Sequence, residues 1–373
     1  MDPATTCCPN LACPARGPTG QGTIGIHSRK AKRCLCPACQ KTFTATKGTG
    51  LYRLRTAAET GRLVVPRLAH GCPPPAIVVA CGDDERTGTS WVARAGGQGP
   101  AVQAQLVEPP RDLGHVRADA IRLKKPGGLV WRALARMVTT RGWRAGEVSA
   151  PRARTRMRRW IERVRAWALP RPLLLCPDGV GSSLRAMRET LRDPVRPGEQ
   201  GRPRWRPWRH RGLAPVVQRS AQRRGGEVER RIVDGTPARV ETLRRRSHGD
   251  GVINTAESEW RNATFRERLA SLTCRGRALA RRTLPLRHGM EVSGTIDHCC
   301  TPHERLRSAG PAARGTARAS PPAMAAGITD HCWPVQELRS LHVPPPRWTP
   351  PTQRGRPSPA LKRLMEQWCG DHG

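Results

Sequence analysis

Three acidic residues of this chain, Asp119, Asp178 and Glu259, occupy positions that suit metal-dependent cutting of nucleic acid. Asp119 falls in a strand-like run, Asp178 closes an apolar run, and Glu259 opens a helix-like segment. Two-metal phosphoryl chemistry requires carboxylates from separate elements, because they must hold two cations roughly 3.5 to 4 Å apart around one scissile phosphate. Oxygen ligands suit Mg²⁺ or Mn²⁺. We therefore expect two such ions at these carboxylates.

Residues near the third carboxylate add candidates. Glu257 competes with Glu259 for the metal-binding role. Asn262 lies one helical turn after Glu259 and is a candidate to orient that carboxylate or to contact DNA; the alternative is a surface asparagine with no special role. His303 follows Pro302 and is a supporting candidate, against the alternative of a capping or structural histidine.

Four cysteines near the N-terminus have the spacing of a structural zinc site. Cys8-x4-Cys13 is followed after 22 residues by Cys36-x2-Cys39, so the pattern consists of two pairs of thiolates. A closed four-thiolate site is structural and not catalytic. The choice of ligands stays open because two more cysteines are close by, and a metal-free cysteine-rich stretch is the alternative. The two competing cysteines are Cys7 and Cys34.

The charge of the chain predicts a polyanionic partner. It carries 66 Lys and Arg against 29 Asp and Glu, a formal net charge of +37. Neutralising phosphates explains affinity for double-stranded DNA but not catalysis on it. We find no signal peptide, no lipidation motif and no apolar run near the roughly 18 residues that span a membrane. We therefore expect no membrane partner and a cytoplasmic location, at the bacterial nucleoid.

The elements that would position the carboxylates are best defined at 113–180. A turn signal at Pro126 to Gly128 separates two strand-like runs, 116–124 and 129–138, and 143–149 offers a third strand. Apolar residues at helical spacing follow between Met157 and Ala168, and 173–176 reads as a short buried strand. Hairpin, third strand, helix and strand predict an α/β domain that begins like ribonuclease H.

The N-terminal side predicts a DNA-binding module. Residues 57–69 have helical spacing, prolines interrupt the pattern, and a second helix begins near Asp84. This pattern fits a helix-turn-helix with Arg86 and Thr87 as DNA contacts, although a plain helical hairpin fits it equally well.

Two other regions are rich in Arg, Pro and Gly. Residues 187–250 predict an irregular basic insertion, in which Arg204 and Arg206 beside tryptophans are candidate DNA contacts; a surface insertion with incidental tryptophans is the alternative. Residues 306–373 predict a tail with a closing helix near 360–368.

Three stretches of the chain resemble bacterial insertion-sequence transposases of the IS-one-like kind, which belong to the DDE transposase and integrase group. They are Cys36-x2-Cys39-Gln40-Lys41-Thr42-Phe43 with Thr46 to Thr49, the run Asn254 to Leu269, and Pro302-His303-x2-Leu306. The resemblance implies a zinc ribbon at 1–50, a helix-turn-helix at 51–98 that recognises transposon ends, and a ribonuclease-H-like catalytic core at 110–305. It also implies that Asp119, Asp178 and Glu259 are the catalytic carboxylates.

The chain departs from the family pattern at several positions. Ala120 stands where a glutamate usually follows the first aspartate, and Pro177 precedes Asp178 in place of Thr or Ser. Polar residues replace the aromatic residues expected before the Pro-His motif: Asp297, His298 and Cys299. These departures indicate a divergent copy.

The expected function is therefore a DNA transposase that cleaves and joins element ends, acting as a homo-oligomer because two ends must be held. The alternatives are a zinc and helix-turn-helix DNA-binding protein that has lost catalysis, and a transposase relic without activity. Leu, Ile, Val and Phe make up only about 17% of the chain, which is below the roughly 20% at which a high net charge begins to indicate disorder. This composition keeps the relic among the alternatives.

Overall fold

The computed structural model describes most of the chain in two compact units. One unit consists of Met1–Gly61 with Gln336–Gly373, and the other is Arg62–Val335. The described residues are 2–17, 24–54, 58–82, 84–107, 109–125, 128–144, 148–149, 154–177, 181–196, 202–209, 211–219, 227–247, 263–269, 282–308, 318–351 and 355–369.

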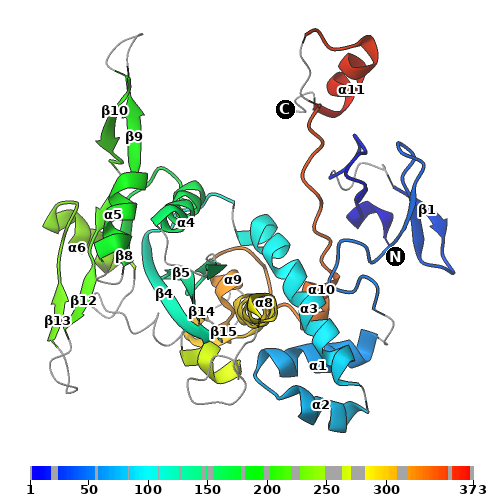
Figure 1. The fold of residues 1–373 in the computed structure, drawn as a ribbon, viewed down its shortest axis with the longest axis horizontal. Helices are drawn as coiled ribbons and strands as arrows, with labels where there is room; N and C mark the ends of the chain where they lie inside the picture. The colour runs from blue at the N-terminus through cyan, green and yellow to red at the C-terminus, as the bar shows by residue number, and fades with distance from the viewer. Residues whose placement is uncertain are drawn as a thin grey trace. The chain divides into compact units, whose positions relative to one another are not determined.

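A small antiparallel sheet organises the first unit. Its strands are β1 (Gly25–Ser28; labelled in Figure 1), β2 (Arg33–Leu35) and β3 (Thr42–Thr44), and β2 lies between the other two. A short 3-10 helix (Pro3–Thr5) precedes them, and the Asp2 carboxylate accepts a hydrogen bond from its Ala4 N–H. Ile24 and Phe43 pack with buried cysteines to form the core. A sheet this small has little apolar area to bury, so this module needs a further source of stability.

The C-terminal segment packs on this module. It contains α10 (Val335–Ser340) and α11 (Pro359–Cys369). Gly50 N–H donates to the carbonyl of Arg339 at 2.9 Å, and a ring nitrogen of His342 lies 2.6 Å from the carbonyl oxygen of Ala45. Part of the region expected to be a tail therefore belongs to a folded unit.

A mixed sheet forms the centre of the second unit. Its strands are β4 (His115–Lys125), β5 (Gly128–Met137), β6 (Trp143–Arg144), β8 (Leu173–Pro177) and β11 (Arg211–Leu213), in the order β11-β8-β4-β5-β6; β7 (Val148–Ser149) pairs with β5. β4, β5 and β6 are antiparallel neighbours, whereas β8 is parallel to β4 and β11 is parallel to β8. The expected hairpin, third strand, helix and strand are all present.

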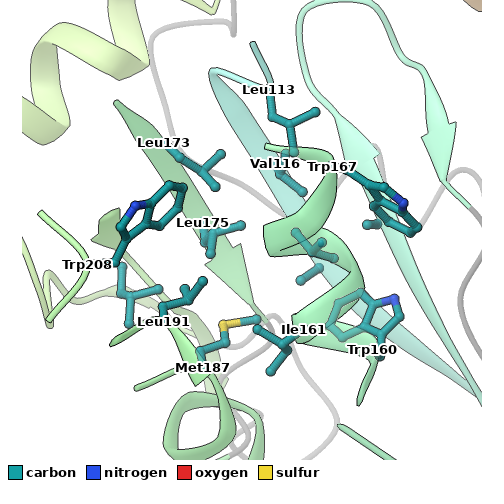
Figure 2. Packing of buried hydrophobic residues seen from close by; sticks show 14 of the residues in the cluster. Leu113, Val116, Trp160, Ile161, Trp167, Leu173, Leu175, Met187, Leu191 and Trp208 are labelled. Atoms are coloured by element: carbon teal, nitrogen blue, oxygen red, sulfur yellow. The ribbon is translucent and has the colours of Figure 1, made fainter. Parts of the chain in front are cut away.

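Two helices bury one face of this sheet. α4 (Arg154–Trp167) and α5 (Gly181–Thr190) pack against the strands through apolar side chains that include Val116 on β4 and Leu175 on β8 (Figure 2). α4 presents Trp160, Ile161, Val164 and Trp167, which recur at helical spacing. Tryptophan thus supplies core volume that other aromatic residues usually provide.

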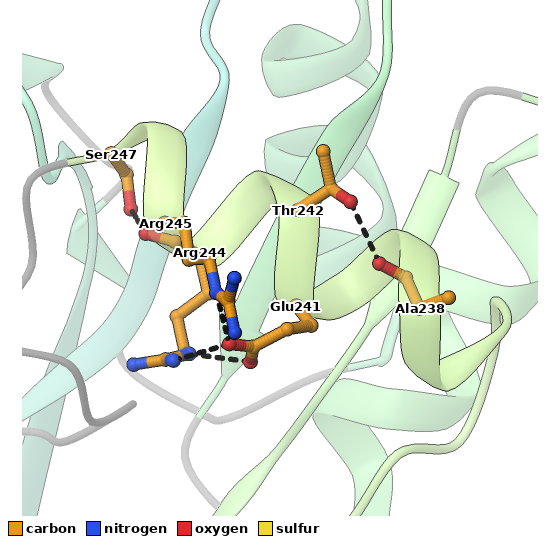
Figure 3. Close-up of polar contacts among 6 residues, drawn as sticks. All are labelled: Ala238, Glu241, Thr242, Arg244, Arg245 and Ser247. Atoms are coloured by element: carbon orange, nitrogen blue, oxygen red, sulfur yellow. Dashed lines mark hydrogen bonds and ion pairs between the residues drawn. The ribbon is translucent and has the colours of Figure 1, made fainter.

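The opposite face of the sheet carries different residues. Side chains alternate along a strand, so His115, Arg117 and Asp119 of β4 point away from Val116 and Ala118. On this second face α6 (Pro237–Arg246) covers Leu174 and Cys176. The last turn of α6 contains Arg244, Arg245 and Arg246, and the first two pair with Glu241 (Figure 3).

The basic region 187–250 corrects one expectation. It was expected to be irregular, yet its described residues include α6 and two antiparallel pairs of strands: β9 (Arg192–Val195) with β10 (Arg204–Pro207), and β12 (Val216–Arg219) with β13 (Glu227–Arg230). The β9–β10 pair exposes most of its side chains, so its sequence lacks the apolar alternation that identifies a half-buried strand. A similar short pair, β14 (His303–Ser308) and β15 (Arg318–Ser320), precedes α9 (Pro322–Ala325).

Helices precede this sheet in the sequence. They are α1 (Ala58–Ala69), α2 (Pro74–Cys81) and α3 (Glu85–Val102), with a π-helical turn at Gln103–Val107. Asp84 caps α3, because its carboxylate accepts a hydrogen bond from Arg86 N–H at 3.1 Å. The expected break and the expected start of a helix near Asp84 are both present. None of the helices described has the length and apolar character needed to cross a membrane.

Glycine allows α3 to approach α8 (Thr283–Cys300) closely. A Cβ on Gly96 would lie 2.5 Å from the Cα of His288, and one on Gly99 would lie 2.8 Å from the Cβ of Glu291. Gly97 points elsewhere, since a Cβ there would meet nothing within 4 Å. The contact between the two helices therefore depends on missing side chains at two positions.

These two neighbouring glycines give a matched test of the packing. We expect Gly96→Ala to lower the free energy of unfolding by about 1–3 kcal/mol, because the added methyl group must push the backbone of α8 away. We expect Gly97→Ala to leave it unchanged or raise it by about 0.5–1 kcal/mol, since alanine is the better helix former. Chemical denaturation measures both. Equal effects of the two substitutions would contradict this helix contact.

Candidate metal centre, carboxylate site and basic surfaces

Four cysteine sulfurs come together at the end of the small sheet. The Sγ atoms of Cys8, Cys13, Cys36 and Cys39 all lie within 4.8 Å of one another. The Cys8–Cys39 and Cys13–Cys36 separations are 3.8 and 3.9 Å. A tetrahedral zinc ion with Zn–S bonds of about 2.3 Å places its sulfurs about 3.8 Å apart, whereas a disulfide requires about 2.05 Å. The donor set and its spacing therefore fit a structural zinc ion.

Two short turns present these thiols. Cys13 N–H donates to the carbonyl of Asn10 at 3.0 Å, which closes the loop after Cys8. Cys36 directly follows β2, and its N–H donates to the carbonyl of Lys41 at 3.1 Å. Gln40 has a left-handed φ of 53°, so the chain reverses immediately after Cys39. Each pair of ligands therefore comes from one tight reversal of the backbone.

The thiols differ in acidity. Burial raises the pKa of Cys13 to about 11. Burial also disfavours the Cys39 thiolate, but hydrogen bonds from the Asn10 side chain and the Lys41 N–H outweigh it, and the pKa of Cys39 falls to about 7. Because a thiolate and not a thiol binds metal, Cys39 is the ligand best prepared to receive an ion.

The competing cysteines lie outside this cluster of four. Cys7 and Cys34 are both buried, and burial raises the pKa of each thiol. Cys34 points into the small core with Ile24 and Phe43. The structure thus groups the same four cysteines that the spacing singled out, and both competitors behave as buried apolar side chains.

Asp119 lies where β4 meets the end of β8. The parallel register pairs His115 with Leu174 and ends with Ala118 beside Pro177. Asp119 is the next residue on β4, it is half-buried, and it pairs with Leu134 on β5.

The other proposed carboxylates lie outside the described residues: Asp178, Glu259 and its competitor Glu257, together with Asn262. The described part of β8 ends one residue before Asp178, at Pro177, which is the partner of Ala118 in the parallel register.

His303 belongs to a buried ionic cluster. Its Nε2 lies 3.3 Å from one carboxylate oxygen of Asp297, and Nη1 of Arg268 lies 3.5 Å from the other. Asp297 is only 1% exposed. The polar residues of α8 that depart from the family pattern are therefore buried, and Asp297 is held between two basic groups. This arrangement favours the structural interpretation of His303.

The elements that contain Arg268 and Asp297 lie on the same face of the sheet as Asp119. Arg117 on β4 pairs with Arg136 on β5, which pairs with Trp143 on β6, and cross-strand partners share a face. Trp143 contacts Phe265 at 6.0 Å between ring centroids and lies against Gly294 of α8. Residues 263–269 and α8 therefore pack on the face that contains Asp119.

A buried hydrogen-bond chain on that face was not anticipated from the sequence. Nδ1 of His115 lies 3.0 Å from Oγ of Ser247, and its Nε2 lies 3.2 Å from Sγ of Cys176. Ser247 donates its own proton to the carbonyl of Arg244 (Figure 3). Ser247 must then accept from Nδ1–H, and the Cys176 thiol must donate to Nε2. In the sequence, the only indication of these hydrogen bonds is that His115 and Asp119 fall on the same face of one strand.

The two titratable groups in this series of hydrogen bonds, His115 and Cys176, are held neutral. Burial, together with the charge of Arg117, lowers the pKa of His115 to about 3. Burial raises the pKa of Cys176 to about 12. The chain therefore links β4, β8 and the C-terminal end of α6 without burying a charge.

The remaining candidates are DNA contacts on two separate elements. Arg86 is exposed and Thr87 is half-buried in the first turn of α3, next to its Asp84 cap. Arg204 and Arg206 are exposed on β10. Among the described residues, no contact joins the pair on α3 to the pair on β10. Each pair is therefore a separate candidate for DNA contact.

Two comparisons with known proteins found no match. No family model matches the chain, and no curated protein matches it. A function must therefore be argued from the residues described above.

Metal analysis tests the cysteine cluster. We expect the purified chain to hold about one zinc ion and Cys36→Ser to lose it, because three thiolates no longer close a tetrahedral site. Cys34→Ser is the matched control, since it alters a buried cysteine on the same strand region outside the cluster. Equal loss of zinc from both variants would show that the four cysteines are not the ligand set.

The pH dependence of stability tests the lowered pKa of buried His115. A histidine in the unfolded chain protonates near pH 6.5, whereas native His115 stays neutral until about pH 3. The unfolded state thus binds more protons below pH 6.5, and His115 lowers the free energy of unfolding by at most about 1.4 kcal/mol per pH unit as the pH falls toward 3.

We expect His115→Gln to be less stable at pH 7 and to lose this slope between pH 6 and 4. His27→Gln changes an exposed histidine of β1 and should keep the slope. Urea denaturation at several pH values measures both variants. A slope in His115→Gln equal to that of the unaltered chain would contradict a depressed pKa.

Proposed function

We propose that this chain is a DNA transposase that cleaves and joins the ends of an insertion element by two-metal phosphoryl transfer. One observation carries the proposal: the parallel register of β4 and β8 ends with Ala118 beside Pro177, and an aspartate follows each of them. Residues at the same level of parallel neighbours point to the same face. The proposal requires the carboxylates of Asp119 and Asp178 to bind the same pair of metal ions.

The topology of the sheet supports a ribonuclease-H-like core. A hairpin, a third antiparallel strand, a helix and then a strand parallel to the first follow in that order. α4 and α5 cover one face, and the other face carries His115, Arg117 and Asp119 of β4. We assign the third carboxylate to Glu259, in keeping with the resemblance to IS-one-like transposases.

In this proposal the carboxylates hold the ions and the basic residues hold the DNA. When bound, two Mg²⁺ or Mn²⁺ ions supply an activated water or 3′-hydroxyl and stabilise the leaving oxygen. Arg117 and Arg136 lie on the same face of the sheet as Asp119 but are buried, so the DNA contacts must come from exposed basic residues. The large excess of Lys and Arg attracts the phosphate backbone independently of its sequence.

The N-terminal elements support end recognition. A zinc-loaded Cys8, Cys13, Cys36 and Cys39 site would stabilise a module too small to depend on its own core. α2 and α3 are joined by a short turn, with Arg86 and Thr87 at the start of the second helix, which is where a helix-turn-helix protein contacts bases. Because two ends must be held, we propose a homo-oligomer on double-stranded DNA.

A second function is favoured by a specific observation. Pro177 ends β8 and has no N–H to donate to the strand ladder, and it stands directly before Asp178. If that departure displaces the carboxylate, the chain retains the cysteine module, α3 and a basic surface. The second candidate is thus a DNA-binding protein without strand cleavage.

Cleavage and strand transfer on labelled DNA that carries the flanking element's inverted repeats distinguish the two functions. With Mg²⁺ or Mn²⁺ we expect both activities, and we expect Asp119→Asn and Asp178→Asn to lower each by roughly two orders of magnitude or more, since even outer-shell partners of a metal contribute 10–100-fold. Glu366→Gln alters an exposed carboxylate of α11 and should retain activity. DNA binding without cleavage by the unaltered chain would reject the transposase and leave the binding protein.

A further inference from the structure

Two tryptophans three residues apart occupy opposite environments in the basic region. Trp208 is 7% exposed and belongs to the core beside α4 and α5, whereas Trp205 on β10 is 59% exposed. A single exposed apolar side chain is ordinary on a protein surface, so the residues around Trp205 must indicate whether it has a partner. The sequence, which alternates both tryptophans with arginine, does not separate the two roles.

The base of the β9–β10 ribbon is fixed to the core. The guanidinium of Arg165 on α4 donates to the carbonyl of Thr190 at 3.1 Å and pairs with the carboxylate of Asp193 on β9. It also lies 5.9 Å from the centroid of the Trp208 ring. Trp208 N–H donates to the carbonyl of Leu191 at 3.0 Å. Trp208 and Arg165 therefore anchor the ribbon, which in Figure 1 extends away from β8 and α5.

The register places different groups on the two faces of the ribbon. Trp205 pairs with Pro194, and Arg206 pairs with Asp193. Alternation then puts Trp205 on one face and both Arg204 and Arg206 on the other, about 6.7 Å apart along the strand. All four residues of β10 are exposed. The narrow β9–β10 ribbon thus presents an exposed aromatic ring on one face and two cationic side chains on the other.

Proline and charge decide the kind of partner. β9 contains Pro194 and β10 contains Pro207, and proline has no N–H with which to extend a sheet. Addition of a protein strand to either edge is therefore disfavoured. Exposed arginines are complementary to phosphate, and an exposed tryptophan stacks on any base. Bases inside a duplex are already stacked on their neighbours, so such a tryptophan selects unpaired bases.

We propose that the β9–β10 ribbon binds single-stranded DNA, with Trp205 stacked on an unpaired base and Arg204 and Arg206 bound to the adjoining phosphates. The inference rests on the proposed DNA partner but not on the catalytic carboxylates. Such binding gives the ribbon a preference for unpaired bases over a duplex, which the positive charge of the protein alone does not provide.

Binding of labelled oligo(dT) and of a duplex of equal length, measured by fluorescence anisotropy on the full chain, tests the ribbon. Stacking contributes about 1–3 kcal/mol per base, so we expect Trp205→Ala to weaken oligo(dT) binding by roughly 5- to 100-fold and duplex binding by less than about twofold. Trp205→Phe, which keeps an aromatic ring, should retain most of the affinity. Arg204→Ala and Arg206→Ala should each weaken binding and reduce its salt dependence.

Leu284→Ala is the matched control, because Leu284 on α8 is 58% exposed and lies on a different element. It should bind oligo(dT) as the unaltered chain does, and circular dichroism should show all variants folded. Normal oligo(dT) binding by Trp205→Ala, or equal losses for oligo(dT) and duplex, would overturn the ribbon site alone. A preference for oligo(rU) would reassign it to RNA. Failure of the unaltered chain to bind any DNA would reject the proposed function as well.

Discussion

The parallel pairing of β8 with β4 is the constraint on which the second unit depends. Because side chains alternate along a strand, this register fixes at once which residues face α4 and α5 and which face α6 and α8. A shift by one residue would turn His115 and Arg117 toward the apolar face with Trp160 and turn Val116 toward the polar groups of the other face. The apolar face therefore locks the register, and the register in turn brings Asp119 to the end of β8.

Arginine has two roles in this chain, and only one of them concerns the surface. Arg165 anchors the β9–β10 ribbon, and buried Arg211 pairs with Asp234 at 3.0 Å while it donates to the carbonyl of Leu191. Such groups stabilise a core that is poor in phenylalanine and tyrosine, because a guanidinium can satisfy several carbonyls that would otherwise be buried without partners. The net charge of +37 therefore overstates the charge that is free to attract DNA.

The sequence predicted the elements whose signals are local. Such signals depend on residues that are close together in the sequence. They predicted the cysteine cluster, the cap at Asp84 and the succession of strands around α4. The β9–β10 ribbon was missed because its exposed side chains carry no apolar periodicity. The His115 chain was missed because its members come from three elements that only the sheet register and α6 bring together. Asp178 and Glu259 lie outside the described residues, so their predicted roles remain predictions.

The two faces of the sheet differ in the residues that they bury. Leucine and tryptophan on the α4 and α5 side supply the hydrophobic stabilisation, which depends on buried apolar area. The opposite side holds Arg117, Arg136 and Asp297, and a buried ionic group is tolerated only when oppositely charged or hydrogen-bonding groups surround it. Apolar contacts also stabilise this face, because α6 covers Leu174 and Trp143 packs on Phe265. The hydrogen bonds of neutral His115 with Ser247 and Cys176 limit the cost of burying polar groups beside them. Charged and apolar residues therefore share the face that carries Asp119, whereas the α4 and α5 face is apolar.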